Sequence, residues 1–195
     1  MSTAQPKFEY SLNNDVRAVT AMAASLIPYI YEDELYGALP GTLPRLTVGG
    51  LIMRLNRLAV IRALLSPDQQ KAVDEAQRQF DAARKEWPVA YEGKLQRELA
   101  ARLQSLSQTI RDCATEPRRC AEVYPSDIEK RVIVEGLQAE ADANKALTPQ
   151  QFALIRATDN QLRTYTQASD FIWDMRLQPA YPKDPYWYLY ASARR

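Results

Sequence analysis

Residues 67–113 read PDQQKAVDEAQRQFDAARKEWPVAYEGKLQRELAARLQSLSQTIRDC, and this stretch decides the fold. It carries one apolar stripe whose mean spacing, about 3.6 residues, is the repeat of an α-helix. The stripe consists of Val73, Ala76, Phe80, Ala83, Trp87, Tyr91, Leu95, Leu99, Leu103, Leu106, Ile110 and Cys113. Because its phase continues across Pro88, the pattern predicts one long kinked helix or two nearly collinear helices.

The rest of this segment is charged, with opposite signs four residues apart. The pairs are Asp74 with Arg78, Asp81 with Lys85, and Glu98 with Arg102. Such pairs are typical of a solvated helix face, so we expect the face opposite the stripe to meet water.

Three helix-start signatures divide the chain further. Ser66-Pro67-Asp68-Gln69 and Thr148-Pro149-Gln150-Gln151 combine an N-cap with proline at the first helical position, and Ser126-Asp127-Ile128-Glu129 is a capping box without proline. They predict helix starts near residues 67, 127 and 149.

With a turn at 114–125 and helices at 127–146 and 149–177, the chain is expected to fold back as a long antiparallel hairpin. Its arms would span about 67–113 and 126–177. Pro88 and Pro149 lie at similar distances from the turn. They mark either a paired bend of the two arms or a coincidence.

A two-helix base is expected to precede the hairpin. Apolar residues recur at helical spacing over 14–36, where Pro28 should kink or divide the helix, and again over 47–65. The second helix carries Arg54, Arg57 and Arg62 among its apolar residues. We interpret it as a core helix with snorkelling arginines, the alternative being a basic surface helix that binds nucleic acid or anionic lipid.

The loop between these helices, YGALPGTLPRLTVGG at residues 36–50, holds four of the six glycines. Arg45, Thr47, Gly49 and Gly50 stand where a helix N-terminus presents free amides, so they are the candidate binding site for a small anion. The phosphate-loop motif is absent and no strand is predicted before the loop. A packed connection between helices is therefore the simpler interpretation.

Two further features are candidate sites. Cys113 and Cys120 are too far apart in sequence for a metal-binding motif; we expect free thiols in a reducing cytoplasm, or a disulfide at the hairpin tip under oxidation. The tail 179–195 is rich in proline and aromatic residues, and it either packs on the helices or binds a partner. Its candidate contact residues are Tyr181, Tyr186, Trp187, Tyr188 and Tyr190.

The composition excludes several kinds of chemistry. The chain of 195 residues has no histidine, which excludes histidine-dependent hydrolases and histidine-ligated zinc or haem. The acidic run Glu32-Asp33-Glu34 lacks the spacing of paired metal ligands. We therefore expect no enzyme activity, no cofactor and no metal. A net charge of +1 argues against nucleic-acid binding.

No leader-peptide pattern and no membrane-spanning segment is visible in the sequence, so a cytoplasmic protein is expected. We predict an all-α protein, an elongated bundle of about five helices. Residues 1–178 would form one helical domain, with the base at 14–65 and the hairpin at 67–177. Residues 179–195 would form a separate aromatic tail. The expected function is non-catalytic: a scaffold or assembly subunit that binds a protein partner or itself. The alternatives are an anion-binding or small-molecule-binding regulatory bundle and a small nucleic-acid-binding subunit.

Overall fold

The structure is a computed structural model that describes residues 10–194, and its helical content confirms the all-α class. Predictions for residues 1–9 and 195, including the absence of a leader peptide, lie outside the described residues. The α-helices are α1 (Leu12–Ala24), α2 (Leu26–Tyr31), α3 (Val48–Val60), α4 (Pro67–Glu86), α5 (Pro88–Thr115), α6 (Pro117–Asp127), α7 (Glu129–Ala143) and α8 (Pro149–Tyr165). The 3-10 turns are η1 (Arg62–Leu64), η2 (Met175–Ala180) and η3 (Trp187–Tyr190), and the strands are β1 (Thr166–Ala168) and β2 (Ala191–Ala193).

The first predicted helix is divided, as its proline suggested. The break falls at Ser25, between α1 and α2, and Pro28 occupies the first turn of α2, where no intrahelical amide donor is needed. Helix α1 begins two residues before the predicted start at residue 14, because Ser11 caps it by accepting the amide of Asn14 at 3.3 Å. The polypeptide leaves the helix after Tyr31, so the loop to α3 is longer than expected.

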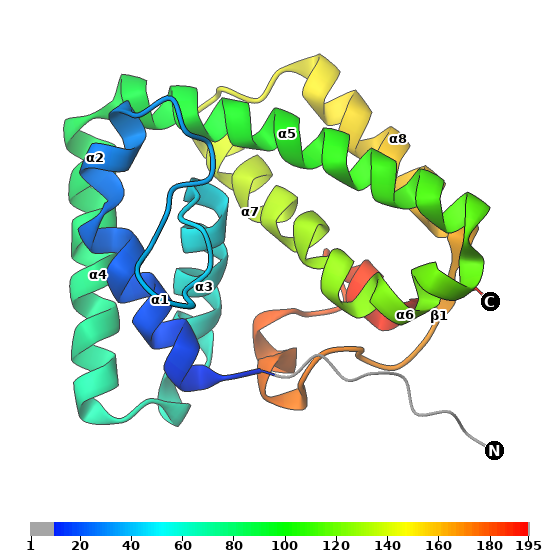
Figure 1. Cartoon of the computed structure of the whole chain (residues 1–195), viewed down its shortest axis with the longest axis horizontal. Coiled ribbons are helices and arrows are strands. Elements are labelled where there is room, and N and C mark those ends of the chain that lie inside the picture. Colours follow the sequence, from blue (N-terminus) through cyan, green and yellow to red (C-terminus); the bar gives the residue numbers. More distant parts are fainter. Residues whose placement is uncertain (1–9, 195) are drawn as a thin grey trace.

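The long first arm is a prediction that the structure corrects. Figure 1 shows α4 and α5 running in clearly different directions, with the chain turning at Trp87. A residue before proline is disfavoured in the α conformation, and Trp87 accordingly has φ −125° and ψ 50°. The stripe is buried on both sides of Trp87, but α4 packs it against α1 while α5 packs its part against α7 and α8.

The second arm is also more divided than predicted. The expected turn at 114–125 holds α6, which starts with Pro117 at its first position. Ser126 is not a cap, because its hydroxyl donates to the Val123 carbonyl at 2.8 Å, and α7 begins three residues later. The helix expected over 149–177 ends at Tyr165, where β1 pairs antiparallel with β2 from the end of the chain.

The hairpin is therefore α5 with α7, closed by α6, and α8 folds back along α5 (Figure 1). Pro88 lies beside the end of α7, whereas the start of α8 lies further along α5, where Gln151 Nε2 donates to Gln96 Oε1 at 2.6 Å. Glu140, near the end of α7, accepts from Arg84 Nη1 at 2.9 Å and from Tyr91 Oη at 3.3 Å, and these donors flank Pro88.

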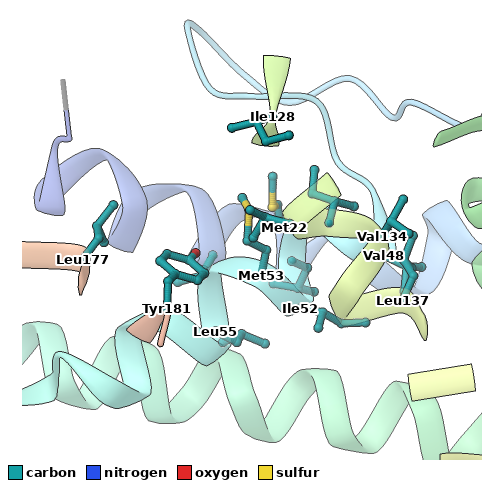
Figure 2. Packing of buried hydrophobic residues seen from close by; sticks show 14 of the residues in the cluster. Met22, Val48, Ile52, Met53, Leu55, Ile128, Val134, Leu137, Leu177 and Tyr181 are labelled. Carbon is teal, nitrogen blue, oxygen red and sulfur yellow. The ribbon is translucent and has the colours of Figure 1, made fainter. Parts of the chain in front are cut away.

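Helix α3 lies at the centre of one continuous hydrophobic core (Figure 2). It packs against α1, α4, α5, α7 and η2. Gly49 permits the closest of these approaches, because a Cβ atom at this position would lie 2.5 Å from Ile133 Cγ2 and 2.9 Å from Leu137 Cγ. Any side chain here would push α3 away from α7.

Candidate functional site

The predicted anion site at the start of α3 is filled by the protein's own carboxylate. The Gly49 amide donates to Glu98 Oε2 at 2.8 Å, and the Gly50 amide donates to the N-cap hydroxyl of Thr47 at 3.0 Å. Glu98 is completely buried, although the sequence places it on a solvated face. A carboxylate is favoured at this position by the free amides and by the helix dipole.

Helix α5 holds both ends of the loop that precedes α3. Four residues before Glu98, the equally buried Lys94 donates from Nζ to the carbonyls of Glu32, at 2.6 Å, and Glu34, just beyond α2. Burial lowers the pKa of Lys94, and the neighbouring Arg97 lowers it further. A cation thus meets the C-terminal end of α2 and an anion meets the N-terminal end of α3, each with the sign that the helix dipole favours.

These contacts leave the four predicted anion-binding residues in separate roles. Arg45 is exposed, whereas Thr47, Gly49 and Gly50 are buried. Both glycine amides have partners within the chain, and Arg102 completes the cluster by donating to Glu98 Oε1 at 3.2 Å. We interpret the cluster as the device that fixes the loop onto α5.

A second buried ionic cluster joins α3 to Tyr10, the first described residue, and to Tyr181 in the C-terminal segment. Asp15 accepts from Arg57 Nε at 2.6 Å and from the Tyr10 hydroxyl at 3.0 Å, and it lies 3.3 Å from Arg54 Nε. Burial lowers the pKa of Arg54, and Arg57 lowers it further; burial raises the pKa of the neighbouring Tyr181 to about 12.

Of the three arginines expected to snorkel, Arg54 and Arg57 are thus buried around Asp15. Arg62 does reach the surface, where it binds Asp74 at 2.6 Å. All three arginines make ion pairs within the chain.

The aromatic tail packs on its own chain. Tyr181 and Tyr188 are buried, and Tyr186, Trp187 and Tyr190 are half-buried. The guanidinium carbon of Arg131 lies 4.9 Å from the centroid of the Tyr188 ring. The Tyr190 hydroxyl donates to the Tyr181 carbonyl at 2.9 Å. The most apolar surface of the tail is therefore used inside the fold.

A different aromatic group is exposed, at the corner between α4 and α5. The rings of Tyr31 and Trp87 meet edge to face with centroids 5.4 Å apart, while 57% of Tyr31 and 37% of Trp87 remain exposed. Ile27 lies one turn before Tyr31, and Val89, two residues after Trp87, is 85% exposed. We call Ile27, Tyr31, Trp87 and Val89 the corner patch.

Carboxylates dominate the sequence beside the corner patch. Glu32, Asp33 and Glu34 follow Tyr31, and Glu86 and Glu92 stand on either side of Trp87 and Val89. All five of these acidic residues are exposed. Lys85 and Arg97 are the exposed cations of the same segments, so the surroundings of the patch carry a negative net charge.

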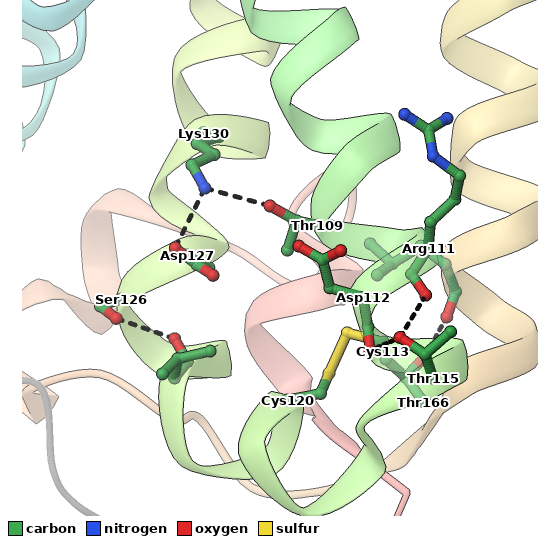
Figure 3. Close-up of a disulfide and its surroundings, with 12 residues drawn as sticks. Thr109, Arg111, Asp112, Cys113, Thr115, Cys120, Ser126, Asp127, Lys130 and Thr166 are labelled. Atoms are coloured by element: carbon green, nitrogen blue, oxygen red, sulfur yellow. Dashed lines mark hydrogen bonds and ion pairs between the residues drawn. A yellow bond between two sulfur atoms is a disulfide. The ribbon is translucent and has the colours of Figure 1, made fainter.

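The second corner, between α5 and α6, contains a disulfide (Figure 3). Cys113 and Cys120 are bonded at 2.01 Å with their Cα atoms 4.9 Å apart, so the thiols expected to be free are joined. A hollow of about 280 Å³ lies inside this corner. It is lined by Thr109, Asp112, Cys113, Glu116, Arg119, Cys120, Val123, Ser126 and Asp127.

Residues 10–194 contain neither a metal-binding cluster nor a helix suited to cross a membrane. No group of three or more acidic or cysteine side chains there is placed to hold a metal ion. No helix within the same range combines the length and the apolar character that a membrane crossing requires.

Comparison with protein-family models, curated protein sequences and solved structures finds no significant match to this chain.

Proposed function

We propose that this protein is a non-catalytic binding protein, a scaffold or assembly subunit that recognises a protein partner through the corner patch. The observation that supports this proposal is the exposed edge-to-face pair of Tyr31 and Trp87. Tyrosine and tryptophan dominate the energetics of protein interfaces, because they bury a large area at a small cost in conformational entropy.

The exposure of the patch favours a binding role over a purely structural one. A buried aromatic pair would stabilise the fold, but Val89 is 85% exposed and contributes almost nothing to the core. Solvent-exposed apolar side chains that gather at one place mark interaction sites more often than isolated ones do. The tail is the weaker candidate for the contact surface, because Tyr181 and Tyr188 are already buried.

The charge around the patch supports a basic partner. Five carboxylates in the adjoining segments would repel an acidic surface and attract a basic one. We therefore expect a protein segment with an apolar anchor for the Tyr31–Trp87 pair and lysine or arginine residues beside it. Its association should slow as the salt concentration rises, because salt screens these exposed charges.

Val89 and Val123 provide two variants of one chemical type for the test. Val89, at the α4–α5 corner, is 85% exposed, and Val123, in α6, is 37% exposed. The full chain and its Val89→Gln and Val123→Gln variants are used to capture proteins from cells, and the captured partner is then purified and titrated. We expect Val89→Gln alone to weaken the purified complex at least about tenfold, equivalent to 1.4 kcal/mol.

Equal binding by all three proteins would overturn the proposal. Light scattering tests the remaining alternative, that the patch binds a second copy of the chain. If the wild type dimerises and Val89→Gln is monomeric, the patch is an interface but the basic partner is wrong.

A further inference from the structure

The disulfide at the α5–α6 corner has a route to solvent through the hollow that it borders. Cys113 and Cys120 are each only 5% exposed, yet both line the hollow of about 280 Å³. Such a volume accommodates a molecule of several heavy atoms, so a small thiol could reach the sulfur atoms without unfolding the helices. Figure 3 shows the bond beside Asp112, with Thr109 and Asp127 nearby.

The walls of this hollow carry a negative net charge. Asp112, Glu116 and Asp127 are offset within the lining by Arg119 alone. From outside the lining, Lys130 donates to Asp127 Oδ1 and to the Thr109 hydroxyl, each at 3.0 Å. Even with Lys130 included, carboxylates exceed cations, so the hollow disfavours an incoming anion.

Helix α6, which the disulfide fastens to α5, carries the C-terminal segment. The Tyr124 hydroxyl donates to the Tyr188 carbonyl at 2.8 Å, and Trp173 Nε1 donates to the Pro125 carbonyl at 2.6 Å. Strand β2 also packs against α6. Releasing α6 from α5 would therefore loosen the segment that closes the fold.

We propose that this hollow is a thiol–disulfide exchange site for small neutral or cationic thiols, and that reduction there loosens α6 and the C-terminal segment. A thiolate attacks one sulfur of the Cys113–Cys120 bond, forming a mixed disulfide, and the electron pair of the broken bond leaves on the other sulfur, which takes a proton from water. A second thiol then attacks the mixed disulfide. Two small thiols are oxidised to their disulfide, and the protein gains two thiols.

The access to the bond through the hollow supports a regulatory role. Disulfides in reducing compartments are usually transient or redox-sensing, whereas those of secreted proteins persist. A bond that is packed against helices but reached through a hollow would respond to the thiols around it in either setting. The charge of the hollow then decides which thiols act.

The test compares two thiols of opposite charge on the native full chain. Cysteamine is cationic and 2-mercaptoethanesulfonate is anionic, and each reduction rate is divided by the thiolate concentration. The same chain in urea is the control, because it keeps the disulfide and loses the hollow. At low salt we expect the folded chain to favour cysteamine about tenfold more than the unfolded chain does.

Two further measurements complete the test. Asp112→Asn with Glu116→Gln leaves Asp127 against Arg119 and Lys130, so the preference for cysteamine in the folded chain should fall to that of the unfolded chain or below it. Hydrogen exchange should quicken at least about fivefold in β2 after reduction of the native protein. A rate that does not depend on thiol concentration would mean that unfolding must precede reduction, and the site would be refuted. The same conclusion follows if the ratio of the two reduction rates is the same in the folded and unfolded chains. It also follows if hydrogen exchange in β2 is unchanged after reduction.

Discussion

The two corners at the ends of α5 share the same backbone turn before a proline but are held by different contacts. In both, one residue separates two helices and the next helix begins with proline. Trp87 has φ −125° and ψ 50° before Pro88, and Glu116 has φ −128° and ψ 66° before Pro117. The backbone is similar because proline disfavours the α conformation in the residue before it and suits the first position of the next helix.

The difference lies in what holds each corner. The α5–α6 corner is closed by the Cys113–Cys120 bond, and α6 binds the C-terminal segment through Tyr124, while residues 114–119 are exposed. The α4–α5 corner has no such covalent link, and Trp87 packs there against Tyr31 with part of both rings in solvent. The backbone of a turn is thus set by adjacent residues, whereas its contacts also depend on segments far away in the chain.

The largest expected effect is alkaline unfolding, which acts on both corners. Burial raises the pKa of Tyr91 at the first corner and of Tyr124 at the second. Because these pKa values are raised above the unfolded value of 10.0, their stabilisation is complete below pH 10 and is lost as the pH rises further. By pH 11 we expect a loss of about 1.4 kcal/mol for each such tyrosine. Burial also raises the pKa of Tyr10, Tyr29, Tyr181 and Tyr188, so the summed loss exceeds that of any single substitution below.

Urea unfolding at pH 9 and pH 11 measures this loss. The lowered pKa of Lys94 acts in the opposite direction, because stability rises as the pH passes its folded pKa. Because Lys94 is a single group and the buried tyrosines are several, their destabilising effect should exceed its stabilising effect. A net gain in stability at pH 11 would contradict the burial of the tyrosines.

The second prediction separates the centre of α5 from its exposed corner. Leu99 is fully buried, so Leu99→Ala should reduce the free energy of unfolding by about 3 kcal/mol. Trp87 is 37% exposed, and Trp87→Ala should cost less than about 2 kcal/mol although the residue is larger. Urea denaturation of the two variants gives the comparison, and equal losses would place Trp87 in the core.

The third prediction concerns the covalent link at the α5–α6 corner. The bond joins cysteines seven residues apart. Closing so short a loop lowers the conformational entropy of the unfolded chain and stabilises the fold by about 2 kcal/mol. The double variant Cys113→Ser with Cys120→Ser should lose this amount in urea unfolding. A loss below about 0.5 kcal/mol would show that the helices alone hold the corner.

The smallest expected effect compares the two prolines. Pro88→Ala should reduce stability by about 0.5 to 1 kcal/mol, because proline restricts the unfolded chain. Pro117 lies inside the loop that the disulfide closes, so Pro117→Ala should cost less in the oxidised protein. After reduction the two costs should become similar. Thermal unfolding of both variants, oxidised and reduced, makes the measurement.

Most helices could be predicted because their signals are local. The boxes at Ser66 and Thr148 mark the starts of α4 and α8, and nearly all of the stripe is buried. The direction of the chain after Trp87 could not be predicted, because a continuous stripe fits any helix packed on one side. It does not show that α4 faces α1 while α5 faces α7.

The buried role of Glu98 was missed for a similar reason. Its spacing to Arg102 is typical of a surface pair, but Lys94 and Glu98 stand directly before Leu95 and Leu99 of the stripe. Because α5 packs against α3 and α2 as well as α7 and α8, it buries this second row too. The loop sequence predicts a helix N-terminus, but it does not indicate that a carboxylate 49 residues away binds there.

The affinity of the captured partner for Val89→Gln and Val123→Gln, titrated side by side, tests the contrast between the corners most directly. The proposal predicts at least about a tenfold loss for Val89→Gln and less than about a twofold change for Val123→Gln. Equal changes in the two variants, or a loss confined to Val123→Gln, would contradict it.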